Sequence, residues 1–177
     1  MERDFLRADR PVRHCDSRDR FHPCQSAPFG SRRKRGPFEQ AIGRSRGGRT
    51  SKVHALTDER GRPFGFTLTA GNTHDLVGAA FVLQSSPIPR RLLADRAYDA
   101  RKFREWLTER GCEPVIPPNP TRKNPCSYDK AAYRLRNSIE RMFCRLKDFR
   151  RIATRYDKRA DVFLSGVLIA AAIIWWT

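Results

Sequence analysis

The amino-acid sequence predicts an α/β fold in which one sheet is flanked by helices. Two strand-like runs lie on either side of a short turn near residue 60. After them, helical patterns alternate with short apolar strands as far as residue 117. A strand, helix, strand, helix order favours parallel strands joined by right-handed crossovers, and the leading pair of runs adds an antiparallel hairpin to the same sheet.

The hairpin is predicted from residues 51–69. Residues 52–57 and 63–69 are rich in apolar, β-branched and aromatic side chains, as half-buried strands are. The intervening Asp-Glu-Arg-Gly-Arg at 58–62 contains a glycine of the kind that longer hairpin loops use. We therefore expect two adjacent antiparallel strands.

Two helices are predicted next. Residues 76–83 form a helical pattern that Thr73 or Asp75 could cap, and prolines shortly after residue 83 end it. Residues 100–110 carry apolar side chains at helical spacing. Gly111 follows them in the position that favours a left-handed cap, so the second helix is expected to stop there.

Between these helices, residues 90–95 read as a short apolar run that ends in an acid, Asp95. Such a run is typical of a strand buried in the sheet, and open α/β sheets bind their ligands at the carboxyl ends of the strands. Residues 113–117 are predicted to form a parallel neighbour, followed by a loop rich in Pro and Asn at 117–127. Asp95 is therefore a candidate site residue.

Residues 133–149 are predicted to form an amphipathic helix with two distinct faces. At about 100° per residue, Tyr133, Arg136, Glu140 and Lys147 fall within about 60° of one another. A separate apolar stripe packs inward: Leu135, Ile139, Met142, Leu146 and Phe149. The polar face could be a solvated surface with an Arg136–Glu140 pair at i, i+4, or it could present Glu140 to Asp95.

A carboxylate at a strand tip and another on a helix packed against the same sheet suit a magnesium site. Mg²⁺ takes one or two carboxylates and leaves the rest of its octahedron to water and phosphate. Two ions about 4 Å apart can activate a water or a 3′-hydroxyl and stabilise the leaving oxygen of a phosphodiester. Asp95 and Glu140 are therefore the predicted ligands of Mg²⁺ or Mn²⁺.

The charge of the chain indicates a polyanionic partner. Lys and Arg number 36 against 19 Asp and Glu, which gives a formal net charge of +17 at pH 7. The surplus gathers in two stripes, one near residues 32–49 and one over 141–159, as expected for double-stranded DNA binding. The first stripe supplies five candidate DNA-binding residues: Arg32, Arg33, Arg35, Arg44 and Arg46.

The chain is expected to divide near residue 50. Residues 1–50 are rich in Arg, Pro, Gly and Ser and are predicted to be a basic, largely disordered segment, whereas 51–177 carry the folded domain. Residues 162–176 are apolar all round but short for a membrane span, so a helix buried against the sheet is favoured over membrane contact. No apolar leader precedes the fold, and the cytoplasm is the expected compartment.

The five cysteines show no Cys-x2-Cys pair, which argues against a disulfide framework. A cluster of two His and two Cys at 14–24 could hold zinc, although its spacings match no common finger. His54 is expected to be structural, and His74 has no assigned role.

Four motifs together resemble bacterial insertion-sequence transposases of the Asp-Asp-Glu type. They are the Tyr-x2-Arg-x3-Glu-x6-Lys pattern from Tyr133, Leu-Ala-Asp-Arg-Ala-Tyr-Asp at 93–99, Gly-Arg-Ser-Arg-Gly-Gly-Arg-Thr-Ser-Lys-Val-His at 43–54, and Arg-Arg-Ile-Ala-Thr-Arg-Tyr-Asp-Lys at 150–158. The resemblance implies a ribonuclease H-like fold and matches Asp95 and Glu140 to the second and third catalytic acids. It also matches Tyr133, Arg136 and Lys147 to the residues that position DNA. A homodimer on DNA is a possible form of the complex.

The N-terminal segment departs from this family pattern. Asp16, followed by Ser17, is the best match to the first catalytic acid, but residues 10–21 carry few apolar side chains. Because a strand buried on both faces needs a near-continuous apolar run, we expect the sheet to be incomplete at this strand. A truncated or frame-slipped gene copy would explain why the family pattern returns only near Lys34.

Three functions follow from these observations. The chain could be a transposase catalytic domain that cleaves DNA with a metal ion and joins the freed 3′-hydroxyl to target DNA. It could be a catalytically dead DNA-binding remnant of such an enzyme. It could also be a small cationic accessory protein of membranes or nucleic acid, a hypothesis that rests on charge and the C-terminal helix alone.

Overall fold

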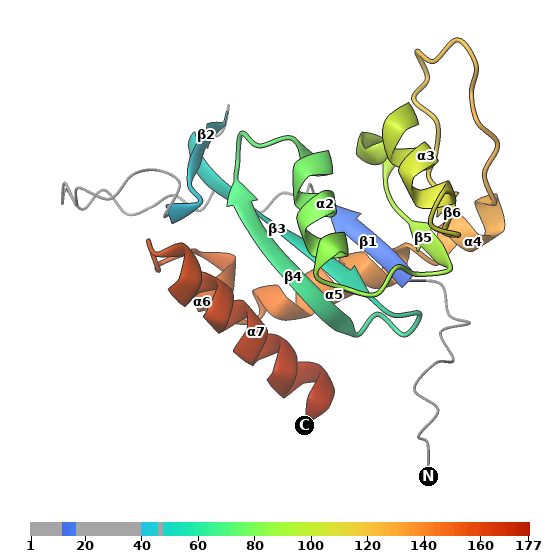
Figure 1. The fold of residues 1–177 in the computed structure, drawn as a ribbon. Coiled ribbons are helices and arrows are strands. Elements are labelled where there is room, and N and C mark those ends of the chain that lie inside the picture. Colours follow the sequence, from blue (N-terminus) through green and yellow to red (C-terminus); the bar gives the residue numbers. More distant parts are fainter. Residues whose placement is uncertain (1–11, 17–39, 46–47) are drawn as a thin grey trace.

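A six-stranded mixed sheet forms the centre of the molecule (Figure 1). The structure, a computed structural model, describes residues 12–16, 40–45 and 48–177. The strands lie in the order β2-β3-β1-β5-β6, and β4 pairs with residues 51–57 of β3. Their bounds are β1 (Val12–Asp16), β2 (Gly43–Ser45), β3 (Gly48–Thr57), β4 (Pro63–Ala70), β5 (Arg91–Leu93) and β6 (Glu113–Val115). The predicted α/β class is confirmed.

Strands β3 and β4 form the predicted hairpin. They are antiparallel, with Val53 opposite Leu68 and His54 opposite Thr67. Asp58 organises the turn, because its carboxylate accepts the backbone N–H groups of Arg60 and Arg62 at 2.9 Å each. Strands β5 and β6 are parallel, as predicted.

Strand β1 was not expected, and the prediction of a sheet that is incomplete at this position is wrong. Residues Val12–Asp16 lie between β3 and β5, antiparallel to the former and parallel to the latter, and Asp16 stands opposite His54. The apolar-run argument failed because strand pairing uses backbone N–H and C=O groups, which two neighbouring strands can satisfy in a polar segment. The rest of the predicted disorder within residues 1–39 lies outside the described part of the chain.

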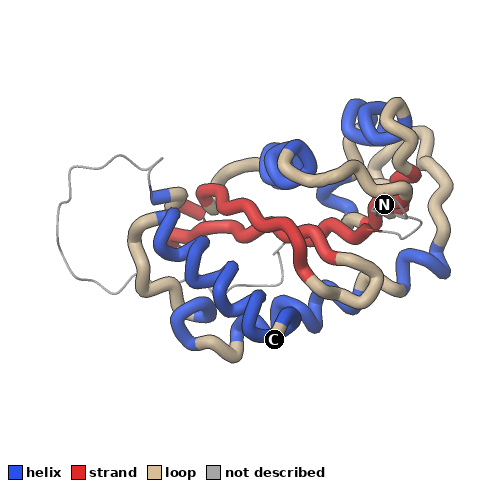
Figure 2. The backbone as a smooth tube through the Cα atoms, turned by 60° about the horizontal axis from the view of Figure 1, so that its bottom comes forward, coloured by secondary structure: helices blue, strands red, loops and turns tan. Residues whose placement is uncertain are grey.

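Helices cover both faces of the sheet (Figure 2). One face carries α2 (Asp75–Gln84), the short 3₁₀ helix η1 (Arg96–Tyr98) and α3 (Arg101–Thr108). The other carries α4 (Lys130–Arg134), α5 (Asn137–Lys147), α6 (Arg150–Ala153) and α7 (Ala160–Trp176). Leu56 and Leu92 pack with α2 and α3, whereas Val53 and Ala55 pack with α5 and α7, so alternate residues of the strands serve separate cores.

The helix predicted over 133–149 is divided in two. It turns at Leu135 and Arg136, where i to i+3 hydrogen bonds replace the helical ladder. The division arises because the two parts pack on different strands: Ala132 of α4 lies in a core with Leu93 and Val115, whereas α5 packs on β3. Asp129 begins α4 by accepting the N–H groups of Ala131 and Ala132.

The other helices agree with the predictions in position. Helix α3 ends before Gly111, whose φ of 72° is the left-handed conformation expected there. Helix α2 is capped by the ring nitrogen of His74, which accepts the N–H of Leu76 at 3.3 Å, so the prediction of Thr73 or Asp75 as the cap is wrong.

Helix α7 packs one face against β4, α5 and α6. Phe163, Val167, Ala170 and Ala171 are buried there, whereas Ile169 on the outer face is 61% exposed. The expected packing of this segment against the sheet is thus confirmed for one face only. Within the described residues, no helix has both the length and the apolar character that crossing a membrane requires.

Candidate active site

Asp95 lies just beyond β5, at the carboxyl end of the parallel part of the sheet. Its carboxylate accepts the N–H of Ala97 at 2.7 Å and so caps η1. Strand β6 holds the preceding residue, since Ala94 N–H donates to the Val115 carbonyl at 3.3 Å. Leu93 faces the core beside α4. The sequence therefore places a partly exposed carboxylate on a fixed strand end.

Glu140 lies in the first turn of α5 and forms the predicted pair with Arg136. The Arg136 guanidinium donates to Glu140 Oε1 at 2.5 Å. The two side chains are 22% and 37% exposed. A pair this accessible adds little stability because water and salt screen it. The arrangement instead keeps a carboxylate and a guanidinium together at the protein surface.

Tyr133 lies beside Arg136 and interacts with the charge of Asp95. Its ring packs edge-on against Tyr128, and the Arg136 guanidinium lies 5.8 Å from its centroid. Burial raises the pKa of the Tyr133 hydroxyl, and the Asp95 carboxylate raises it further, whereas Arg136 and Arg96 lower it. Tyr133 therefore experiences the charges of both Arg136 and Asp95.

Of the remaining predicted site residues, the structure places Lys147 and Arg44 elsewhere, and the others lie outside the description in part or in whole. Lys147 ends α5, two turns beyond Glu140, and is partly exposed. Arg44 is exposed on β2, at the opposite end of the sheet from β5 and β6 (Figure 1). Asp16 ends β1, and its side chain lies outside the description. The other predicted DNA-binding residues also lie outside the described part: Arg32, Arg33, Arg35 and Arg46.

The donor set suits a hard divalent cation in type. Asp95 and Glu140 offer carboxylate oxygens, which Mg²⁺ and Mn²⁺ prefer. Each acid already uses one oxygen within the protein, toward Ala97 N–H and toward Arg136 respectively. Among the residues whose side chains are described, no group of three or more His, Cys, Asp or Glu could hold a metal ion. Among the described side chains, these two acids are the candidate ligands, and they would leave most of an octahedral shell to water, substrate or a further acid.

Asp99 is a charged residue near this site that the sequence analysis did not select. Its side chain is only 1% exposed and is surrounded by donors. Arg104 donates from Nε at 2.8 Å, the backbone N–H of Asn119 donates at 2.7 Å, and Arg122 donates to the same carboxylate. Burial alone would raise the pKa of Asp99, but the hydrogen bonds from Asn119 and Arg104 outweigh it and the pKa is lowered.

The only local sequence signal for this cluster was Asp99 five residues before Arg104. Arg122 lies 23 residues from Asp99 in the sequence, and only the fold brings the two together.

A second polar cluster is buried around His54 of β3, the residue that stands opposite Asp16 of β1. His54 is fully buried, and its Nε2 lies 2.8 Å from the Thr69 hydroxyl. Burial lowers the pKa of His54 to about 4, against a smaller opposing effect of Asp75. Asp75, itself buried, accepts from Lys52 at 2.6 Å. These contacts indicate that His54 is a structural residue, as expected. His74 acts as the N-cap of helix α2.

The motif at 150–158 provides a structural anchor. Arg155 is 7% exposed, and its guanidinium donates to the carbonyls of Gln40 at 2.6 Å and Ala41 at 3.2 Å. It also donates to Ser51 Oγ and lies 4.8 Å from the ring centroid of Phe163. Arg155 therefore ties the chain before β2 to the α6–α7 connection.

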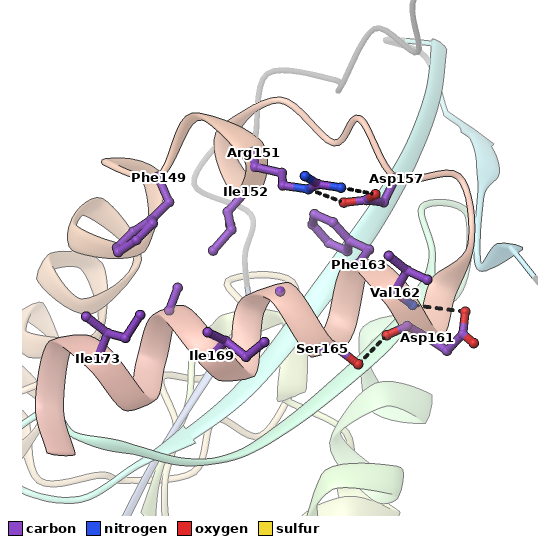
Figure 3. A pocket seen from close by; sticks show the side chains of 12 residues that line it. Phe149, Arg151, Ile152, Asp157, Asp161, Val162, Phe163, Ser165, Ile169 and Ile173 are labelled. Carbon is purple, nitrogen blue, oxygen red and sulfur yellow. Dashed lines mark hydrogen bonds and ion pairs between the residues drawn. The ribbon is translucent and has the colours of Figure 1, made fainter. Parts of the chain in front are cut away.

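An apolar pocket of about 490 Å³ lies between α6 and α7 (Figure 3). Figure 3 shows the Arg151–Asp157 ion pair, at 2.8 Å, beside Phe163 at one end of the pocket. Its walls are mostly apolar: Phe149, Ile152, Val162, Phe163, Ile169, Ala170 and Ile173. Neither Asp95 nor Glu140 lines it, so this pocket is separate from the acidic pair.

Comparisons with known proteins agree with the motifs. The family model described as "Transposase DDE domain" matches residues 11–175. A Brucella ovis protein named "Putative transposase for insertion sequence element IS6501" is 35% identical over 127 residues, which cover 71% of this chain and 98% of that protein. A Burkholderia cepacia protein named "Putative transposase for insertion sequence element IS402" is 32% identical over 137 residues. That match covers 71% of this chain and 63% of the relative.

The chain thus spans nearly all of the Brucella protein and somewhat less than two thirds of the Burkholderia one. The resemblance to insertion-sequence transposases is confirmed by these matches.

Proposed function

Because the chain belongs to the transposase DDE domain family, we propose that it is the catalytic domain of a DNA transposase that cleaves a phosphodiester at insertion-sequence ends and joins the freed 3′-hydroxyl to target DNA. The observation that supports the proposal is that Tyr133 interacts with the charge of Asp95 and lies beside Arg136, which pairs with Glu140. One acid follows the central parallel strand and the other lies on α5, which packs on the same sheet.

The arrangement of strands supports a ribonuclease H-like fold. A long antiparallel hairpin, β3 and β4, adjoins β1, and β1 is followed across the sheet by the parallel strands β5 and β6. Helices lie on both faces. This order brings the ends of β1 and β5 side by side, so Asp16 and Asp95 both stand at or just beyond the carboxyl end of a neighbouring strand.

Each site residue has a role in the proposed reaction. Asp95 and Glu140, with Asp16 as the first acid, would hold Mg²⁺ or Mn²⁺, which activates a water or a 3′-hydroxyl and stabilises the leaving oxygen when bound. Arg136 neutralises Glu140 in the free protein, so its guanidinium is already placed to meet a phosphate that enters beside that acid. Tyr133 and Lys147 would position the DNA strand.

Charge supports double-stranded DNA as the partner. The net charge of +17 favours polyanions, and Arg141 and Arg145 are exposed on α5, the helix that carries Glu140. The exposed Arg44 and the basic segment at 32–35 would add contacts to the phosphate backbone that do not depend on sequence. A homodimer on DNA remains part of the proposal, since two transposon ends need two sites.

The alternative is a catalytically dead DNA-binding remnant of a transposase. One observation favours it: in the described part of the chain, the acidic pair has no third carboxylate in a metal-binding group. A two-metal displacement commonly needs another acid to bridge or orient the second ion. The alternative therefore depends on Asp16, which ends β1 and whose side chain lies outside the description.

A nicking assay distinguishes the two functions. Duplex DNA carrying the insertion-sequence ends is incubated with the chain and Mg²⁺ or Mn²⁺, beside Asp95→Asn and Glu140→Gln variants. Metal-dependent nicking well above both variants supports the catalytic domain, and its loss in Asp16→Asn assigns the first acid. If the chain binds the DNA but nicks it no more than Asp95→Asn does, the result supports the catalytically dead remnant.

A further inference from the structure

The loop between β6 and α4 forms an arm over residues 117–127. Figure 1 shows it rising beside α3 and returning to α4. Its middle is exposed and carries no acidic residue, whereas Arg122 and Lys123 are both cationic. Loops of this length without secondary structure are uncommon in compact domains and often bind ligands. The composition of the arm suits an anionic partner.

The base of this arm is fixed by Asp99. The Asp99 carboxylate accepts the N–H of Asn119 at 2.7 Å and pairs with Arg122, and both donors belong to the arm. On its other side it pairs with Arg104 of α3 at 2.8 Å, and Arg104 donates in turn to the Ile116 carbonyl at 2.7 Å. One buried carboxylate thus joins α3 to both ends of the segment at 116–122.

The same short element connects Asp99 to Asp95. Residues Arg96–Tyr98 form η1, in which Tyr98 N–H donates to the Asp95 carbonyl and Asp99 N–H to the Arg96 carbonyl, both at 3.1 Å. Because η1 is a single turn capped by Asp95 itself, it connects the acid directly to Asp99, which holds the arm. Loss of the Asp99 contacts would therefore free the arm from its position relative to the acid.

Stability alone is a weak explanation for such a cluster. Buried ion pairs often contribute little net stability, because the desolvation of both charges offsets their attraction. They do fix geometry, since each donor and acceptor must stay in place. Asp99 therefore keeps an otherwise extended loop in one position beside the acidic site.

We propose that Asp99 is a positioning residue that holds the 117–127 arm beside Asp95, where Lys123 contacts DNA phosphates. This inference rests on the proposed DNA-binding function and adds a partner surface to it. Arg122 is mostly engaged by Asp99, with a side chain 21% exposed, so Lys123 is the cation that the arm presents.

The test uses the charge change of the Asp99→Asn variant. Asparagine has nearly the same shape, but the substitution raises the net charge of +17 by one, so general electrostatic attraction predicts tighter DNA binding. Release of the arm from residue 99 predicts weaker DNA binding instead. We expect Asp99→Asn to bind duplex DNA more weakly, by on the order of tenfold at 50 mM salt, as for the loss of about one phosphate contact.

Two further variants test whether Lys123 itself contacts a DNA phosphate. Lys123→Gln should lower the slope of log affinity against log salt by about 0.9, the value for one phosphate contact. The matched control is Arg60→Gln, which removes one exposed cation from the β3–β4 turn and should leave the slope unchanged. Circular dichroism of each variant verifies folding. If Asp99→Asn does not fold, Arg122→Gln, which removes one of the two contacts of the arm with Asp99, tests the positioning role instead: weaker DNA binding than that of Arg60→Gln supports it, and equal binding overturns it.

The outcomes separate this inference from the proposed function. A parent chain without salt-dependent DNA binding overturns both. A parent that binds DNA, with Asp99→Asn folded and binding as tightly or more tightly, overturns the positioning role alone. An unchanged salt slope in Lys123→Gln overturns the phosphate contact. Weaker binding by Asp99→Asn together with a reduced slope in Lys123→Gln supports the proposal.

Discussion

Replacing Arg155 with methionine removes the anchor between the chain before β2 and the C-terminal helices. Methionine keeps an unbranched apolar stem, so the substitution chiefly removes the guanidinium. Five donated hydrogen bonds are lost, to the carbonyls of Gln40, Ala41, Asp157 and Lys158 and to Ser51 Oγ. The contact of the guanidinium with the Phe163 ring, 4.8 Å away, is lost with them.

The expected loss of stability is about 3 kcal/mol. A hydrogen bond from a charged donor is worth about 1.5–3 kcal/mol, and bonds that share one guanidinium are not additive. Some carbonyls regain water after the substitution, because the surrounding residues are only partly buried. For a chain of this size, about 3 kcal/mol corresponds to a fall in Tm of roughly 6–12 °C.

Urea and thermal unfolding, followed by circular dichroism, measure this change. Arg150→Met is the matched control, because Arg150 is an exposed arginine of the neighbouring helix α6, and its replacement should change stability by less than about 0.5 kcal/mol. An Arg155→Met variant that unfolds within 0.5 kcal/mol of the Arg150→Met control, at an unchanged urea dependence, would refute the anchoring role.

Two more predictions concern the buried His54 and the glycine that packs against its ring. Burial lowers the folded-state pKa of His54 to about 4, below the ordinary 6.5, so the folded protein binds fewer protons than the unfolded chain between these values. Stability is therefore full above pH 6.5 and falls by about 3 kcal/mol as the pH drops toward 4, a loss that unfolding curves of His54→Gln should lack. Gly78→Ala would place a Cβ 2.2 Å from the His54 ring and should cost about 1–3 kcal/mol, measured by urea unfolding. Gly166→Ala, a helical position with open space around it, should be neutral or stabilising, and equal effects at the two glycines would contradict the packing.

The fold could be predicted where local patterns decide it. The hairpin followed from two apolar runs around 58–62, and the strand before Asp95 from its short apolar run. Strand β1 could not be predicted, because residues 12–16 contain little apolar pattern and their place depends on the backbone groups that β3 and β5 offer. The break between α4 and α5 was missed because the amphipathic pattern continues through Leu135, although the two parts pack on different strands.

The contacts of the candidate site were predictable where the residues lie close together on one helix. Arg136 and Glu140 are four residues apart, and helical spacing alone predicted their ion pair. The strand tip and the helix face predicted that Glu140 could be presented to Asp95, and the structure relates Tyr133 of the same face to Asp95. The Asp99 cluster could not be predicted, because its donors come from α3 and from a loop 20 to 23 residues further along the chain. Helix and strand periodicity relates only residues that are close in the sequence.

The central claim is that Asp95 and Glu140 together bind a divalent cation. It is tested most directly by titrating Mn²⁺ into the chain and measuring free Mn²⁺ by electron paramagnetic resonance, which requires no turnover. The parent should bind Mn²⁺, and Asp95→Asn and Glu140→Gln should each weaken binding at least about tenfold, whereas Glu105→Gln, on exposed α3 surface, should not. Equal Mn²⁺ affinity in the parent, Asp95→Asn and Glu140→Gln would contradict the account.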